Sequence, residues 1–151
     1  MGPFIMKFSH KLSDAIHLLS YLVIYKNDDL SSRAIAASIE TNPSTVRSLM
    51  MNLKQAGLID TRQGSATPEL AKNPEDITMY DVFYAVDMDH ELLHIDTKTE
   101  PKCIVGGNIQ NTLKEEYGKV QNAALQEMKK ITLQEIIDDI LVRQSKKAVS
   151  E

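Results

Sequence analysis

Apolar residues recur at helical spacing through the first third of the chain, and this pattern predicts three consecutive helices. Between the second and third helix, Thr41-Asn42-Pro43 has the composition of a tight turn, and proline suits the first position of the helix that follows. The first expected helix covers 13–25 and has Ser13 as its N-cap, and the second is short and begins at Ser31 or Ser32. The third runs from Pro43 to about Ala56 and ends at Gly57 in the left-handed conformation.

The pattern then changes from helical spacing to short extended segments. Residues 58–62 are expected to form a strand, 63–66 a turn-rich loop, and 69–71 a return strand. After Pro74, Thr78 and Asp81 have the spacing of a capping box and predict another helix, whose buried side would carry Val82, Phe83 and Val86. Residues 87–107 show no period and contain Pro101 and Gly106-Gly107, so we expect a long loop there.

The last third carries one long apolar stripe. Its members are separated by steps of four, four, three, four, four and three, which keeps them on one face of a helix over about 108–130. Thr132 and Glu135 resemble a second capping box before a final helix, and the polar tail from Ser145 is expected to fray. Too little chain remains to cover so long a helix, so we expect a second copy to cover the stripe. The stripe consists of Ile109, Leu113, Tyr117, Val120, Ala124, Met128 and Ile131.

Two short helices, a tight turn, a third helix and a hairpin together predict a winged helix-turn-helix. The expected fold class is therefore mainly α with a small β wing, followed by a long C-terminal dimerisation helix. We divide the chain into a DNA-binding domain over 6–86, a loop over 87–107, and dimerisation helices over 108–144.

The third helix indicates DNA binding because its two faces differ. One face is apolar through Val46, Leu49 and Leu53, and would anchor the helix to its domain. The first turns of the other face are polar, as a helix that contacts base edges in the major groove requires. A plain helical bundle with a hairpin, used for protein contacts, is the alternative. The candidate DNA contacts are Ser44, Thr45, Arg47 and Ser48 on the helix, and Arg62 beside the flexible Gly64 on the wing.

Composition narrows the classes of protein further. The 151 residues are 42% apolar and 25% charged, which is ordinary for a globular protein, and no apolar run approaches the roughly 20 residues of a membrane span. Residues 1–68 carry seven Lys and Arg against five Asp and Glu, whereas residues 69–151 carry ten against sixteen. The less acidic part is the one predicted to meet phosphates. The sequence contains no glycine-rich phosphate loop and no catalytic pairing, so we expect no enzyme.

Two blocks resemble a known family: "LSSRAIAASIETNPSTVRSLMMNLKQAGLIDTRQG" and "ATPELAKNPEDITMYDVFYAVD". They are similar to the Rrf2 family of bacterial winged-helix repressors, which includes the iron–sulfur regulator IscR, the nitric-oxide sensor NsrR and the cysteine-metabolism regulator CymR. The resemblance runs from about Met6 to Leu141, and "LKQAGLI" and "LAKNPEDITMYDVFYAVD" are its most specific parts. It implies a homodimer whose long helices cross and a palindromic operator on double-stranded DNA. It also implies DNA contacts at the helix and wing residues Ser44, Thr45, Arg47, Ser48, Arg62, Gln63 and Gly64.

Two departures from the family pattern change what the resemblance implies. The family's wing usually carries a Gly-Gly-aromatic step, whereas this chain has Ser65-Ala66-Thr67-Pro68-Glu69, which affects the expected wing shape. Cluster-binding members carry three cysteines before the long helix, whereas this chain has Cys103 alone, in "PKCIVGGNIQ". We therefore expect a clusterless branch with no cofactor and no iron–sulfur cluster.

Cys103 and two histidines are the remaining candidate sites. Cys103 would lie near a helix N-terminus beside Lys102, and both lower a thiol pKa, so it is a candidate redox sensor; a small packing residue is the alternative. His90 and His94 would share a helical face and could bind zinc, but their segment has no helical period. We expect a solvated acidic loop there and no metal.

The sequence therefore predicts a cytoplasmic, homodimeric repressor that binds DNA and has no membrane partner. A single cysteine fits the reducing cytoplasm. The alternative function is a winged-helix protein-interaction module that has lost DNA binding, which the altered wing and the acidic C-terminal half would favour.

Overall fold

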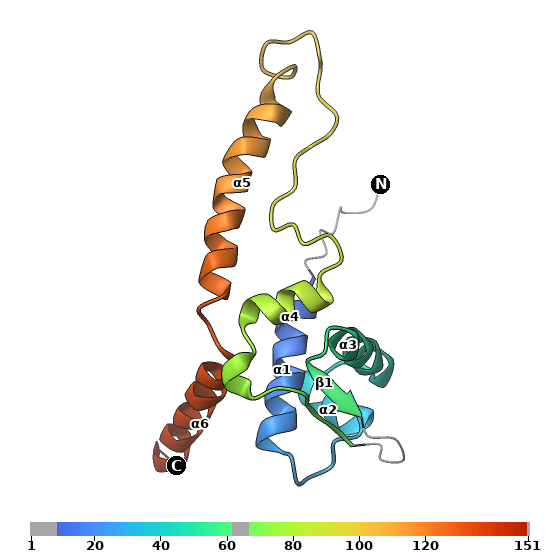
Figure 1. Ribbon diagram of the computed structural model, residues 1–151, viewed down its shortest axis with the longest axis vertical. Coiled ribbons are helices and arrows are strands. Elements are labelled where there is room, and N and C mark those ends of the chain that lie inside the picture. Colours follow the sequence, from blue (N-terminus) through green and yellow to red (C-terminus); the bar gives the residue numbers. More distant parts are fainter. Residues whose placement is uncertain (1–8, 62–66, 151) are drawn as a thin grey trace.

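The computed structural model describes residues 9–61 and 67–150, and Figure 1 shows a helical body from which one long arm projects. The described residues form helices and one two-stranded antiparallel sheet, which confirms the predicted fold class. Among the described helices, none combines the length and hydropathy of a membrane span. The elements are α1 (Lys11–Ile24), α2 (Ser32–Ile39), α3 (Pro43–Gln55), β1 (Ile59–Thr61), β2 (Pro68–Leu70), the short 3-10 helix η1 (Pro74–Asp76), α4 (Met79–Val86), α5 (Ile109–Met128) and α6 (Leu133–Ser150).

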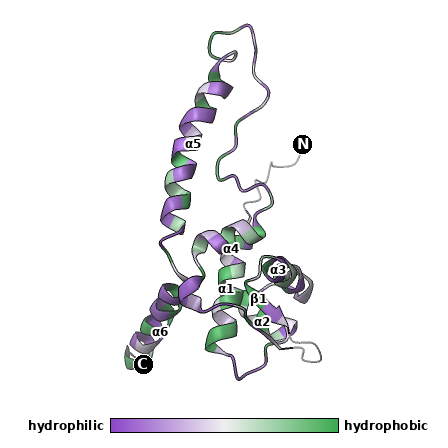
Figure 2. Ribbon diagram, in the orientation of Figure 1, coloured by the Kyte–Doolittle hydropathy of each residue, from purple (hydrophilic) through white to green (hydrophobic). Residues whose placement is uncertain are grey.

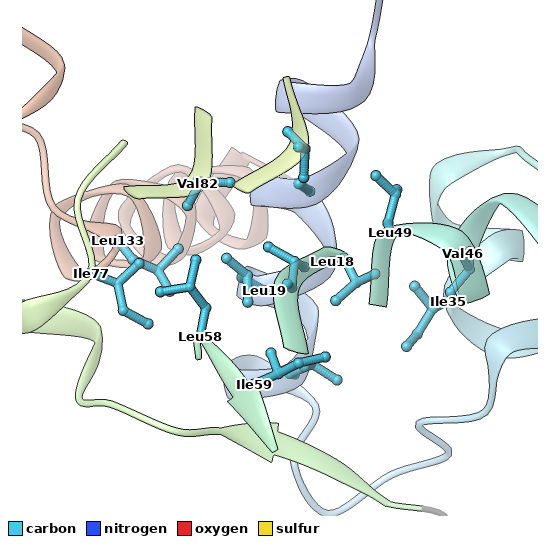
Figure 3. Close-up of a cluster of buried hydrophobic side chains, with 14 of the residues drawn as sticks. Leu18, Leu19, Ile35, Val46, Leu49, Leu58, Ile59, Ile77, Val82 and Leu133 are labelled. Atoms are coloured by element: carbon cyan, nitrogen blue, oxygen red, sulfur yellow. The ribbon is translucent and has the colours of Figure 1, made fainter. Parts of the chain in front are cut away.

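The core is organised around α1. Figure 3 shows Leu18 and Leu19 at its centre, with side chains of α2 and α3 on one side, those of α4 and α6 on the other, and Ile59 of β1 below them. Both leucines are fully buried, and burying one such side chain contributes about 1.5–3 kcal/mol. Because α2 and α3 pack on α1 through this cluster, the core fixes the position of the helix-turn-helix. The labelled residues around the two leucines are Ile35, Val46, Leu49, Leu58, Ile59, Ile77, Val82 and Leu133.

The predicted caps are confirmed at α2 and α4. The Ser31 hydroxyl accepts the N–H of Ala34 at 3.2 Å, so Ser31 is the cap of α2. Thr78 and Asp81 form a reciprocal capping box at the start of α4. Each such cap contributes about 1 kcal/mol.

The predicted cap of α1 is wrong. The helix begins at Lys11 rather than after Ser13, and His10 occupies the cap position without a side-chain cap bond. The first helical bond joins the N–H of Asp14 to the carbonyl of His10 at 2.8 Å. Leu12 packs against the core, so burial of this leucine favours a helix that starts one turn earlier than the hydroxyl pattern indicates.

The exit from α3 leads directly into the hairpin. Gly57 has φ of +77°, a left-handed conformation that favours glycine. Its N–H donates to the carbonyl of Lys54 at 3.0 Å, and the N–H of Leu58 donates to that of Leu53 at 2.9 Å, so the last helical carbonyls are satisfied. β1 then pairs with β2 in the register Ile59↔Leu70.

The arm consists of the segment 87–107, which runs outward from the body, and α5, which returns along it (Figure 1). Every residue of 87–107 is described and none lies in a helix or strand, which confirms the predicted loop. The side chain of Gln121 holds the segment: its Oε1 accepts the N–H of Leu92 at 3.0 Å, and its Nε2 donates to the carbonyl of His90 at 2.9 Å. Figure 2 shows hydrophobic and hydrophilic residues alternating along α5.

α6 brings the chain back into the body. The N–H of Leu133 donates to the carbonyl of Ile77, and the N–H of Met79 donates to that of Ile131, both at 2.8 Å. The side chains of Leu133 and Ile137 are buried in the same core as Leu18. The hydrophobic core therefore extends beyond the expected domain over 6–86 and includes side chains of α6.

One of the two hydrogen bonds of the predicted capping box at the start of α6 is confirmed: Glu135 donates its backbone N–H to the Thr132 hydroxyl at 3.1 Å. The predicted fraying from Ser145 is wrong, since α6 continues to Ser150. Arg143 bonds Asp139 at 2.6 Å one turn earlier on the same helix. Such i,i+4 pairs support an exposed helix.

Candidate nucleic-acid interface

The turn between α2 and α3 is built from local backbone preferences. Glu40 ends α2 in the left-handed conformation, with φ of +63°. The N–H of Thr41 then donates to the carbonyl of Ala36 at 3.0 Å. Asn42 caps α3, because its Oδ1 accepts both the N–H of Thr45 at 2.9 Å and the Thr45 hydroxyl at 3.1 Å. Pro43 follows at the first helical position. The turn thereby fixes the direction in which α3 leaves α2.

α3 has the two faces that the sequence predicts. Val46 and Leu53 are 0% exposed, and Leu49 is buried beside them. Ser44, Arg47 and Ser48 are exposed on the opposite face, and Thr45 is half-buried. Because the Thr45 hydroxyl already bonds Asn42, it is less available to an external partner than the other three.

The N-terminal ends of α2 and α3 border one open hollow of about 820 Å³. Arg33 and Arg47 line it together with Ser32 and Ser44. The first N–H groups of a helix have no partner within the helix and carry partial positive charge. The hollow therefore combines two guanidinium groups, two hydroxyls and two helix N-termini, which is a set of groups suited to phosphate.

Arg33 and Ser32 were not among the residues predicted from the sequence. The signal that could have found them is their place in the first turn of α2, whose N-terminus faces the same side as that of α3. Asp29 lies at the edge of the hollow, where its carboxylate accepts the N–H of Ser31 at 2.9 Å. That backbone hydrogen bond lowers the pKa of Asp29, so the carboxylate is charged at neutral pH.

The hairpin lies next to the C-terminal end of α3. The ammonium of Lys54 donates to the Thr61 hydroxyl at 2.9 Å and ties the helix to β1. Asp60 and Glu69 face each other across the two strands. The predicted wing contacts, at 62–64, lie outside the described residues.

Cys103 lies in the turn that precedes α5 at the far end of the arm, and it is exposed. The backbone N–H of Gly106, followed by that of Val105, bonds the sulfur and lowers the pKa of Cys103. The lowering agrees in direction with the prediction, although its cause is the backbone of the turn rather than Lys102.

The two candidate zinc ligands do not come together. His90 stacks on the ring of Tyr84, with centroids 3.9 Å apart and planes inclined by 8°. His94 instead lies beside Asp89 and Glu91, with ligand atoms within 4.8 Å of one another and all three residues exposed. Exposed acidic groups of this kind commonly hold no ion.

The predicted dimer stripe lies along α5 and is only partly covered, and its last residue, Ile131, follows the end of the helix. No residue of this fully described helix is buried. Val120, in the middle of the stripe, is 56% exposed. The other six residues of the stripe are half-buried, so the isolated chain covers this face only in part and leaves some of its apolar surface in contact with water.

Comparison with known proteins places this geometry among transcriptional regulators. A model of the Rrf2 family, described as iron-dependent transcriptional regulators, matches residues 8–139. The chain is similar to YwnA of Bacillus subtilis, named as a candidate HTH-type transcriptional regulator, with 36% identity over 130 residues that cover 86% of this chain and 96% of YwnA.

Solved structures share the fold, and two of them illustrate the range of identity. A candidate DNA-binding protein gives a TM-score of 0.67 at 35% identity, covering 84% of this chain and 98% of that one. CymR of Bacillus subtilis, a global cysteine regulator, gives a TM-score of 0.63 at 18% identity, covering 89% of this chain and 98% of its own. The second likeness concerns the fold alone.

Proposed function

The chain belongs to the Rrf2 family of transcriptional regulators, and from this premise we propose that it is a homodimeric repressor of a palindromic DNA operator. Its relatives are named as regulators and not as enzymes. The observation that supports DNA binding most directly is the exposed polar face of α3, held in place by the buried Val46 and Leu53.

In this proposal α3 enters the major groove with its N-terminal turns. Arg47 is the residue best suited to guanine, because a guanidinium bonds O6 and N7 together. Ser44 and Ser48 bond phosphates or base edges beside it, and Thr45 mainly holds the cap of α3. Arg62, Gln63 and Gly64 of the wing would meet the backbone or the adjacent minor groove.

The partly exposed stripe on α5 supports the proposed dimer. Its apolar surface that remains in contact with water in the isolated chain would be stabilised by burial against a second copy. Two α3 helices related by a two-fold axis would contact two half-sites about 34 Å or a multiple of it apart. The operator would then be palindromic, and occupation of a promoter would block transcription.

The donor set does not fit a cysteine-ligated iron–sulfur cluster. The chain has one cysteine, whereas such a cluster takes several thiolates. We propose that this member of an iron-dependent family acts without a cluster in the cytoplasm, and that Cys103, with its lowered pKa, is the candidate site at which an oxidant acts.

A protein-interaction module is the second candidate function. Asp60 and Glu69 place two acidic side chains opposite each other on the described part of the wing. Carboxylates there would repel a DNA backbone, and they favour this alternative.

A DNA-binding titration separates the two functions. The probe is the DNA upstream of the protein's own gene, with an unrelated duplex as competitor at two salt concentrations. A repressor should remain bound to the specific probe in the presence of the competitor duplex. Arg47→Ala should weaken that binding by about 1–3 kcal/mol. Arg143→Ala, an exposed arginine on α6, is the matched control and should bind normally. Binding that disappears with competitor for every upstream fragment tested would favour the protein module.

A further inference from the structure

The outgoing segment of the arm is pinned to α5 at two points and stands away from the helix between them. The side chain of Gln121 bonds the backbone of His90 and Leu92. About three turns earlier on α5, the Nε2 of Gln110 donates to the carbonyl of Asp96 at 3.1 Å. Between these pins lies an open hollow of about 540 Å³, lined by residues of both the segment and α5. The segment is therefore held beside the helix without filling the space between them.

Gly118 lies on the α5 side of this hollow. Glycine inside a helix is destabilising relative to alanine, and a Cβ added at Gly118 would meet no atom within 4 Å. Neither the helical backbone nor packing within the chain therefore requires a glycine at this position. An occupant of the hollow would give it a role, because the missing side chain allows a ligand to approach the helix backbone closely.

The side chains around the hollow define the class of ligand that it suits. Lys114 lines it from α5, and no carboxylate of the described residues pairs with its ammonium. From the segment, Glu91 lines the hollow with its carboxylate 3.7 Å from the ring of His94. Leu93 and Tyr117 contribute apolar surface. A single anionic group can pair with Lys114 while an aliphatic body covers Leu93, whereas Glu91 would repel a second negative charge.

Direct contacts join the hollow to the helix-turn-helix. Gln121 borders the hollow and bonds the carbonyl of His90, whose ring stacks on Tyr84 of α4. α4 in turn packs against α3. His90 has φ of +55°, a strained conformation that a non-glycine residue keeps only where its surroundings fix it. A ligand that displaces Gln121 therefore acts on a strained residue in contact with α4.

We propose that this hollow binds a small aliphatic monocarboxylate and that such a ligand is the effector of the regulator. The hollow is formed within one copy of the chain and shares only Tyr117 with the apolar stripe. Binding therefore does not require the proposed homodimer. The effector role rests on the proposed function, whereas binding of the carboxylate does not, so separate experiments test the two.

Titration of 4-methylpentanoate into the full chain without DNA tests the site. Backbone amide chemical shifts should move saturably in the segment and around Gly118. The alcohol 4-methylpentan-1-ol has the same body without the charge, and it should bind about two- to fivefold more weakly, as expected for the loss of an exposed ion pair. Absence of saturable shifts around the hollow, or equal binding of the acid and the alcohol, overturns the site.

Three variants assign the binding to the hollow. Gly118→Leu fills it from α5 and should abolish binding, and leucine suits a helix interior. Lys114→Gln should bind the acid only as well as the parent binds the alcohol. Lys119→Gln is the matched control and should bind as the parent does, because Lys119 pairs with Glu116 at 3.1 Å and neither residue lines the hollow. Parental affinity in Lys114→Gln overturns the proposed contact with the carboxylate.

Operator binding with and without saturating 4-methylpentanoate tests the effector role. Sodium chloride replaces the sodium salt of the acid in the control, because DNA binding depends on salt. A severalfold change in operator affinity in the parent that is absent from Gly118→Leu supports the effector role, and an unchanged affinity overturns it. A chain that binds the carboxylate but no upstream DNA specifically overturns the proposed function, and with it the effector role, while the binding site stands.

Discussion

Two glycines test whether backbone conformation or local space governs the stability of this chain. An added Cβ at Gly57 or at Gly118 meets no atom within 4 Å. The backbones differ, because Gly57 has φ of +77° after α3, whereas Gly118 lies inside α5. Alanine at each position therefore changes the conformational energy without a collision.

The expected effects have opposite signs. Gly57→Ala places an L-residue in the left-handed region, which costs about 1–2 kcal/mol. Part of that cost is offset by the smaller entropy of the unfolded chain, which leaves a loss of about 1 kcal/mol. Gly118→Ala replaces glycine in a helix interior and should stabilise the fold by about 1 kcal/mol. Gly57→Asn is a milder control, because asparagine tolerates this conformation.

Urea unfolding followed by circular dichroism measures both changes. With a slope of about 2 kcal/mol per molar urea, a change of 1 kcal/mol shifts the midpoint by about 0.5 M. The protein concentration must be the same throughout, because association stabilises a dimer by mass action. Midpoints that move in the same direction for the two alanine variants, or a Gly57→Ala midpoint at or above the parent's, would refute the conformational argument.

Three further predictions concern the cap of α4, the wing and the thiol. Thr78→Ala removes the capping box and should lower the free energy of unfolding by about 1 kcal/mol in the same urea assay; an unchanged midpoint would contradict the cap's contribution. Arg62→Ala should lower the salt slope of operator binding by about 0.9 if it holds one phosphate, and an unaltered slope argues against that contact. Alkylation of Cys103 should rise with pH through a midpoint below that of free cysteine, because bonded N–H groups favour the thiolate and lower its pKa. Peroxide should then weaken DNA binding, and unchanged affinity of protein with a modified thiol would exclude Cys103 as the sensor.

The elements that could be predicted from sequence are those whose determinants are local. The turn at Asn42-Pro43, the left-handed Gly57 and the capping box at Thr78 each depend on a few neighbouring residues, and all are found where expected. The start of α1 could not be predicted from a hydroxyl at Ser13, because the burial of Leu12 depends on packing with distant elements.

The candidate nucleic-acid interface, like the fold, could be predicted from the sequence only in part. The polar face of α3 follows from helical periodicity, whereas Arg33 enters the interface only because the turn brings the start of α2 beside α3. The histidine pair illustrates the converse: residues four apart suggest a shared helical face, but in a segment without helical structure His90 packs on Tyr84 and His94 lies elsewhere.

The burial of Leu133 and Ile137 beside α1 has a consequence for co-translational folding of the protein. The chain emerges from its N-terminal end, and domains usually fold in that order during synthesis. Here the nascent helix-turn-helix leaves the ribosome with part of its core unfilled, since the arm must be synthesised before α6 arrives. Folding of the body should therefore be delayed until translation has passed residue 137. A nascent chain stalled before that point should be more easily cut by protease than one stalled after the released length includes α6.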